Sequence, residues 1–222
     1  MNKYVAIIGD LKKSRDIKQR DKVQARIQSA LEQINFSYHA LIVSKLTLTI
    51  GDEFQSLLKP QVGTLKMLDE LEMKLSDYPF RLGIGYGDIS TAIDRERSIG
   101  ADGEAYWLAR EAIGYVHDNS QGGKIRTHVS GFGQHNDRLL NTLFEVSDLM
   151  KHGWTKLQGD TFALMLRQGI YLPDFDQKGF AQKIGVSQSS LSKRLSAGNI
   201  KLYLKTRNLI GESMEVWSHD DK

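Results

Sequence analysis

The segment LTLTIGDEFQSLL at residues 46–58 decides the fold of the first half of this 222-residue chain. An apolar run in which threonine alternates with larger residues precedes Asp52, and a second apolar run follows Glu53. Two apolar runs on either side of a Gly-Asp pair are typical of a β-hairpin. The sequence therefore predicts two paired strands with Asp52 at the tip, and Glu53 beside it is expected to be a solvated turn carboxylate.

Strand and helix patterns alternate on either side of this hairpin. Residues 3–10, KYVAIIGD, form a continuous apolar run ended by Gly-Asp, which is typical of a central strand buried on both faces. Helical spacing of apolar residues predicts a helix at each of three further places, the first with Asp21 as its N-cap; these are 21–35, 62–78 and 104–118. Two more strands are expected at 79–91, which is rich in glycine, and at 124–129. The order predicts an α+β fold whose sheet contains antiparallel strands.

The composition is that of an ordinary globular protein, with 40% hydrophobic and 26% charged residues. No apolar run approaches the roughly eighteen residues that a membrane helix needs, and Gly-Asp at residues 9–10 comes too early for a secretory leader. We therefore expect a cytoplasmic protein with no membrane insertion. The chain has no cysteine, which excludes disulfides, thiolate zinc sites and a cysteine nucleophile.

Two carboxylates are expected to meet at one end of the sheet, because Asp10 ends the first strand and Asp52 lies at the hairpin tip. Such a pair repels unless a cation neutralises it, and Mg²⁺ takes one or two carboxylates together with substrate phosphates. The next loop offers backbone amides, a hydroxyl and cations near a helix start, where phosphate is favoured; its side chains are Lys12, Lys13, Ser14 and Arg15. These features outline a nucleoside triphosphate site. The alternative, which spacing alone favours, is that both Gly-Asp pairs are ordinary turns or caps.

Four stretches resemble the nucleotidyl cyclase fold that adenylate cyclases share with GGDEF-type diguanylate cyclases. AIIGDLKKS (6–14) resembles the first strand with its metal aspartate, and TIGDEFQSL (49–57) resembles the TxGD hairpin and the GGDEF signature. RLGIGYGDI (81–89) resembles the RxGIxxG strand, and GADGEAYWLAREA (100–112) resembles the G...VNxAxR helix. The resemblance implies a ferredoxin-like palm that binds Mg²⁺ or Mn²⁺ with a purine nucleotide. It also implies roles for four residues: metal ligation by Asp10, Asp52 and the Leu11 carbonyl, and phosphate binding by Arg110.

Three positions depart from those enzymes. Leu48 stands where an adenylate cyclase has its base-reading lysine, and Tyr106 stands where the transition-state asparagine precedes the arginine. Ile50 replaces the first glycine of GGDEF. We therefore expect nucleotide binding without cyclisation. Over its whole length the chain is similar to the SatD family, in which such a domain is paired with a C-terminal helical module.

Residues 172–201 resemble a helix-turn-helix, with Ala181 between the helices, Gly185 at the break and Ser187 as the cap of the second helix. In DNA, one set of side chains would face the major groove and another the phosphates; these are Gln188, Ser189, Ser192 and Lys193, and Lys183, Arg194 and Lys201. Residues 178–207 carry seven cations and no acid, a local charge of +7, which favours double-stranded DNA as a partner. The alternative is a motif used for dimerisation.

Together these features predict a cyclase-like α/β domain over 1–150, followed by a helical linker and helix-turn-helix-like all-α domain over 151–222. The linker is expected to be helical over 148–169, with core positions that include Leu157. The predicted function is a nucleotide- and metal-responsive DNA-binding regulator. The alternative is a Mg-dependent nucleotidyl cyclase or triphosphate-cleaving enzyme whose helical tail serves assembly. A homodimer is expected because helix-turn-helix proteins favour two-fold partners.

Overall fold

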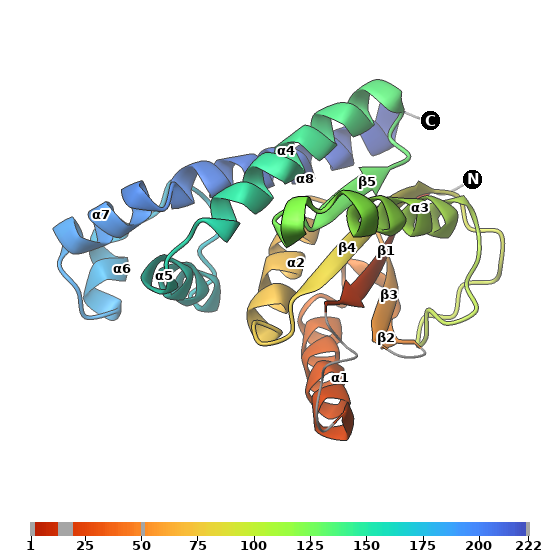
Figure 1. Cartoon of the computed structure of the whole chain (residues 1–222), viewed down its shortest axis with the longest axis horizontal. Helices are drawn as coiled ribbons and strands as arrows, with labels where there is room; N and C mark the ends of the chain where they lie inside the picture. The colour runs from red at the N-terminus through yellow and green to blue at the C-terminus, as the bar shows by residue number, and fades with distance from the viewer. Residues whose placement is uncertain (1–2, 13–19, 50–51, 221–222) are drawn as a thin grey trace.

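A five-stranded mixed sheet lies at the centre of an α+β fold in the computed structural model, which describes residues 3–12, 20–49 and 52–220 (Figure 1). The strand order is β2-β3-β1-β4-β5. β1 pairs antiparallel with β3 and β4, β2 pairs antiparallel with β3, and β5 lies parallel to β4 at the edge. The strands are β1 (Tyr4–Leu11), β2 (Ile42–Leu48), β3 (Glu53–Leu58), β4 (Phe80–Gly87) and β5 (Thr127–Ser130).

Helices cover both faces of the sheet. β1 is therefore buried on both sides, as its continuous apolar run predicts. Val5 and Ile7 join the core formed with α1 (Arg20–Ser37) and α2 (Gly63–Lys74). Ala6 and Ile8 point to the other face and pack against α3 (Glu104–Asn119). A short 3-10 helix, η2 (Gln121–Gly123), follows α3 before β5. Asp10 continues the second series and therefore lies on the α3 side of the sheet.

Glycines in β4 let α3 lie directly on the strand backbone. A Cβ atom at Gly83 would come within 2.2 Å of the Ala109 carbonyl oxygen, and one at Gly85 within 2.1 Å of the Ala105 carbonyl oxygen. The GIGYG sequence therefore serves close helix-strand packing, and the glycine-rich strand expected at 79–91 is confirmed as β4. On the opposite face, Gly9 leaves room for the ring of Phe54.

Two local predictions about helix boundaries are wrong. Asp21 does not cap the first helix, because α1 already begins at Arg20 and Asp21 lies in its first turn. The linker is not one helix: α4 (Gln134–His152) ends at Gly153, and α5 (Lys156–Arg167) begins after Thr155 with a capping box to Gln158. Leu157, predicted to be in the core, is 50% exposed because it lies in the first turn of α5.

The C-terminal helices form an arm that returns to the sheet (Figure 1). They are α6 (Gln177–Lys183), α7 (Gln188–Ala197) and α8 (Ile200–Asp220). α8 runs beside α4, and the hydroxyl of Tyr86 in β4 donates to the Ser218 carbonyl at 3.1 Å. The predicted boundary at residue 150 falls in the last turns of α4, and one hydrophobic core continues across it. None of the helices in the described ranges is both long and apolar enough to cross a bilayer.

A buried carboxylate on α2 joins the two parts of the molecule. Asp69 accepts hydrogen bonds from Lys151 of α4 at 2.8 Å, from Tyr203 of α8 at 2.6 Å and from Tyr171 at 2.5 Å, and pairs with Arg207 of α8 at 3.3 Å. Burial opposes the charge of Asp69, but Arg207 and Lys151 outweigh burial and lower the pKa of this carboxyl to about 2. Arg207 is therefore a buried structural cation and not part of a surface basic patch.

Candidate functional site

The two aspartates predicted to meet do lie at neighbouring backbone positions. In the sheet Asp10 is paired with Glu53 on one side and with Arg81 on the other. The amide of Leu11 donates to the carbonyl oxygen of Asp52 at 3.2 Å, so the hairpin tip lies beside the end of β1. Directly opposed residues of antiparallel strands point to the same face. Asp10, Glu53 and Arg81 therefore share the face that α3 covers.

The carboxylate of Asp10 is partly buried and lies near other charged side chains. Arg81 donates to Asp10 at 3.3 Å. Even so, the pKa of Asp10 is raised, first by burial and then by the charge of Asp52, with a smaller rise from Glu53; Arg81 and His117 act in the opposite direction. A cation bound at this corner would relieve part of that repulsion.

An arginine from α3 closes the same corner. The guanidinium of Arg110 donates to both carboxylate oxygens of Glu53, with 2.8 Å between Nη2 and Oε1. This hydrogen bonding raises the pKa of Arg110. Glu53 is thus the first residue of β3 and an ion-pair partner, so its prediction as a solvated turn carboxylate is wrong. Arg110 lies close to the carboxylates, but with its guanidinium engaged by Glu53.

Arg81 belongs to this corner and was missed by sequence reasoning. Its residue letter is part of the RxGIxxG-like stretch, yet only the pairing of β4 with β1 places it opposite Asp10. Its Nε atom is buried and has no hydrogen-bond partner within the described ranges. The available signal was the antiparallel register, which a single sequence does not specify.

The loop after β1 is described only at its first residues. The side chain of Leu11 is buried, and the residue pairs with Phe80 in the sheet. Lys12 extends its ammonium to the Gly123 carbonyl oxygen at 3.1 Å. The remaining predicted phosphate-binding residues lie outside the described residues; they are Lys13, Ser14 and Arg15.

Two of the three positions that depart from the cyclase pattern, Tyr106 and Leu48, lie in the described part of the chain. Tyr106, one turn before Arg110, is buried against the sheet, and its hydroxyl has no partner among the described residues. Leu48 ends β2 opposite Phe54, whereas Ile50 falls outside the described residues. Within the described part of the chain, no set of three or more His, Asp or Glu side chains is arranged to hold a metal ion.

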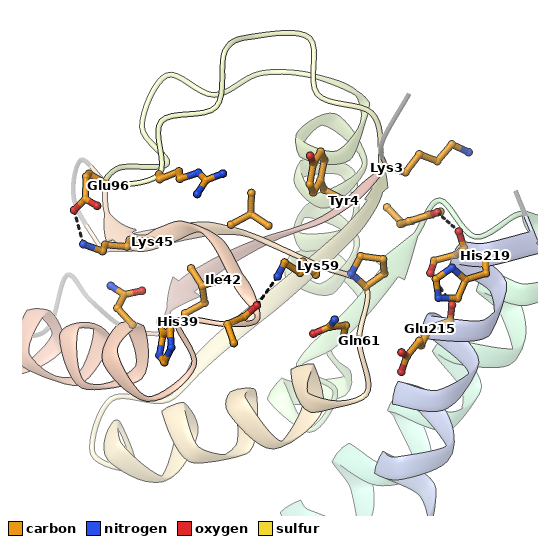
Figure 2. Close-up of a pocket in the computed structure, with 17 residues that line it drawn as sticks. Lys3, Tyr4, His39, Ile42, Lys45, Lys59, Gln61, Glu96, Glu215 and His219 are labelled. Carbon is orange, nitrogen blue, oxygen red and sulfur yellow. Dashed lines mark hydrogen bonds and ion pairs between the residues drawn. The ribbon is translucent and has the colours of Figure 1, made fainter. Parts of the chain in front are cut away.

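A sizeable cavity lies elsewhere. It has a volume of about 670 Å³ and is lined by residues that include Tyr4, Ile42, Lys59 and His219 (Figure 2). Tyr4 begins β1 whereas Asp10 lies near its end, so this cavity is at the opposite end of the strand. Figure 2 also shows that its cations are partly engaged, since Lys45 pairs with Glu96 and Lys59 donates to the Ala40 carbonyl.

The two short helices α6 and α7 carry the residues predicted to contact DNA, except Lys201, which lies in the first turn of α8. Gly185 has a left-handed φ of +69°, and the side chain of Ser187 caps α7 by accepting from the amide of Ser190 at 3.1 Å. The predicted groove-facing residues of α7 are all exposed; they are Gln188, Ser189, Ser192 and Lys193. The predicted phosphate contacts differ in exposure, because Lys183 is exposed whereas Arg194 and Lys201 are half-buried. The Lys201 ammonium lies 5.7 Å from the Phe175 ring centre.

Comparison with known proteins gives a family match and likenesses to solved structures. The family model described as SatD family matches residues 4–214. No curated protein matches the chain. Two solved structures, each described as a bacterial light-regulated adenylyl cyclase, are 12% identical to the chain, with TM-scores of 0.43 and 0.42. Each comparison covers 58% of this chain, but 43% of the first structure and 75% of the second.

Proposed function

The chain belongs to the SatD family, and we propose that it is a nucleotide- and metal-responsive DNA-binding regulator. The observation that carries the proposal is the corner where Asp10 and Asp52 meet, since the pKa of Asp10 is raised by burial and by the charge of Asp52. A site that keeps carboxylates crowded at a structural cost is a candidate for ligand binding. The second support is the exposed polar face of α7.

In this proposal Asp10 and Asp52, with the Leu11 carbonyl, would hold Mg²⁺ or Mn²⁺. The cation would neutralise the carboxylates and draw the phosphates of a purine nucleotide to the corner. Lys12 and the following Lys13, Ser14 and Arg15 would bind those phosphates. Arg110 would join them by sharing or exchanging its Glu53 partner, because an arginine has donors on both edges of its guanidinium.

The strand order supports a ferredoxin-like palm of the nucleotidyl cyclase type. β1, α1 and β2 form one split unit, and β3, α2 and β4 form a second that interleaves with it in the order β2-β3-β1-β4. The buried Tyr106 and the apolar Leu48 replace polar groups on which cyclisation in such enzymes depends. We therefore propose a sensor that binds nucleotide without cyclising it.

DNA would be bound by α6 and α7 as a helix-turn-helix. Six of the seven cations between residues 178 and 207 remain exposed or half-buried after Arg207 is set aside as a buried partner of Asp69. The Asp69 cluster offers the physical link between the two activities, because it ties α2 of the sheet layer to α4 and to α8. A change at the sheet can thereby alter the orientation of the arm.

Calorimetric titration of the full chain with ATP and GTP, with and without Mg²⁺, tests the sensor. We expect binding that needs Mg²⁺ and that weakens at least about tenfold in Asp10→Asn and Asp52→Asn, since charge-assisted contacts of this kind contribute about 1.5–3 kcal/mol each. Asp77→Asn, which removes an exposed carboxylate, is the matched control and should leave binding unchanged.

The same samples are then assayed for turnover. Binding without product supports the sensor, whereas a cyclic nucleotide or a cleaved triphosphate as product would favour the alternative, a Mg-dependent enzyme with an assembly tail. Absence of binding by either nucleotide, or binding that survives both aspartate substitutions, would show that this corner is not the nucleotide site.

A further inference from the structure

The outer face of α8 carries an apolar stripe that nothing in the described structure covers. Leu202 is 50% exposed, Leu209 is 47% exposed and Val216 is 55% exposed. Their spacing of seven residues places them along one line of the helix. The opposite side of α8 is already buried in the core through residues such as Tyr203 and Ile210. A helix that is apolar on two faces needs a second surface to pack against.

Two opposite charges alternate with these apolar residues. Lys205 and Glu212 are exposed at the intervening positions of the same stripe, seven residues apart from each other. Within the described part of the chain neither one has an ion-pair partner. The sequence of the stripe is therefore apolar, positive, apolar, negative, apolar, and its centre is Leu209.

When a second copy of the helix runs in the opposite direction, this order places apolar residues against apolar residues and positive charges against negative ones. In an antiparallel pair centred on Leu209, Leu202 of one copy lies opposite Val216 of the other, and Lys205 lies within one residue, about 1.5 Å of helix rise, of the level of Glu212. Each charged pair occurs twice because the arrangement has two-fold symmetry. A parallel pair would instead place lysine against lysine and glutamate against glutamate, which is destabilising. The charge pattern thus selects one geometry.

We propose that a second copy of this chain binds along α8, antiparallel, with Leu209 on the two-fold axis. Stable interfaces bury about 1,200–2,000 Å² in total, which is more than the stripe alone provides. α4 packs against α8 and also exposes apolar side chains, namely Leu139, Val146 and Leu149; the proposed interface would extend over those that lie on the side of the α8 stripe.

The proposed dimer also sets the spacing of the two α7 helices. α8 begins at Ile200, nine residues before Leu209, so the two α8 starts lie about 27 Å apart at about 1.5 Å per residue. α7 lies beyond that start, which brings the two helices toward the spacing of roughly 34 Å between successive major grooves (Figure 1). This consequence rests on the proposed DNA binding, whereas the dimer itself does not.

Cross-linking through single cysteines tests the axis directly, because the chain has no cysteine of its own. Leu209→Cys places two thiols close together across a two-fold axis, so mild oxidation of the full chain should yield a disulfide-linked dimer. Leu172→Cys, at a position that is 60% exposed but lies outside α8, is the control. If the Leu209→Cys variant cross-links no faster than this control variant, the proposal is overturned.

Exchange of the two charges tests the antiparallel register by sedimentation equilibrium. Lys205→Glu and Glu212→Lys should each weaken dimerisation by about tenfold, and the double variant should return to within about threefold of the original, because it restores opposite charges. Both side chains are exposed, and circular dichroism confirms that each variant is folded. A chain that stays monomeric at all concentrations, or a double variant as weak as the single ones, overturns the proposal. Loss of DNA binding with an intact dimer counts against the proposed function alone.

Discussion

Asp10 shows how a single partly buried charge can lower the stability of a fold. Burial and the charge of Asp52 raise its pKa, which means that the ionised form is less stable in the folded protein than in the unfolded chain. The pair with Arg81 offsets only part of this cost. A residue that destabilises its own fold is typical of a ligand-binding position.

We predict that Asp10→Asn raises the midpoint of thermal unfolding at neutral pH. The substitution removes the unfavourable charge, and the asparagine side-chain oxygen can still accept from Arg81. At a pH below the raised pKa the original carboxyl is protonated, so the difference between the two proteins should shrink. Calorimetric unfolding across this range provides the measurement, and a variant that is less stable than the original at neutral pH contradicts the prediction.

Asp148 on α4 gives a second pH-dependent prediction. Its carboxylate accepts from the amides of Arg126 and Thr127 at 2.8 and 3.0 Å, yet burial raises its pKa to about 6 from an ordinary value of 3.8. The chain therefore takes up a proton on folding between about pH 4 and pH 6, so Asp148 lowers the stability progressively through that range and by a constant amount above it. Asp148→Asn keeps an acceptor without the charge, and should be more stable than the original by about 1–3 kcal/mol at pH 8.

Urea unfolding of this variant at pH 8 and pH 5 checks that sign. The gain should be clearly smaller at the lower pH, because the cost of ionising Asp148 builds up between its ordinary pKa of 3.8 and its folded pKa of about 6. Asp160→Asn, an exposed carboxylate on α5, serves as the comparison and should change the free energy of unfolding little. A gain that is equal at both pH values would count against a raised pKa at Asp148.

The candidate site depends on the contact between β4 and α3, because β4 carries Arg81 and α3 carries Arg110. Gly85→Ala would place a Cβ atom 2.1 Å from the Ala105 carbonyl oxygen, and neither backbone can yield without displacing α3. We expect a loss of about 3 kcal/mol or more in stability, since overpacking against backbone is poorly relieved. Gly114→Ala on the outer side of α3 meets nothing within 4 Å and should stabilise the protein by about 0.5–1 kcal/mol. Urea unfolding of both variants compares the two sides of one helix.

The proposed DNA binding can be tested at Arg194 on α7. Arg194→Ala should weaken binding to a DNA duplex and reduce the slope of log K against log salt by about one, because one phosphate contact is lost. Lys156→Ala, which removes an exposed cation of α5, should leave both quantities unchanged. Gel-shift titrations over a salt series measure them, and equal retention of the original and Arg194→Ala proteins would exclude a phosphate contact at this residue.

The sequence predicted those helices and strands in which buried apolar residues recur at regular spacing. β1, the β2-β3 hairpin and α3 follow from apolar periodicity, and the meeting of Asp10 with the hairpin tip follows from their order. The partners of those charges could not be predicted, because Arg81 reaches Asp10 only through the β1-β4 register. The pairing of Arg110 with Glu53 likewise depends on where α3 crosses the sheet. Contacts between residues far apart in sequence require tertiary positions that periodicity does not encode.

At the scale of the whole molecule, the C-terminal arm is part of the first domain's core. Asp69 on α2 is fully buried, and two of its partners, Tyr203 and Arg207, come from α8. The amide of Val62, just before α2, donates to Glu215 of α8 at 3.1 Å. The N-terminal part therefore depends on charges supplied from beyond residue 200, although its own sequence has the pattern of a complete domain.

A fragment of residues 1–150 is accordingly expected not to fold cooperatively. It would expose the apolar surface that α8 covers, and it would leave Asp69 without Lys151, Tyr203 or Arg207; removing the partners of a buried charge costs about 3–5 kcal/mol. In the fragment, Asp69→Leu should restore part of the stability, because it removes the orphaned charge, whereas in the full chain the same substitution should destabilise by leaving Lys151 and Arg207 buried and unpaired. Circular dichroism during urea titration of the four proteins measures both effects. A fragment that unfolds cooperatively at the same urea concentration as the full chain would instead establish two independent domains, with a boundary where the sequence pattern predicts it.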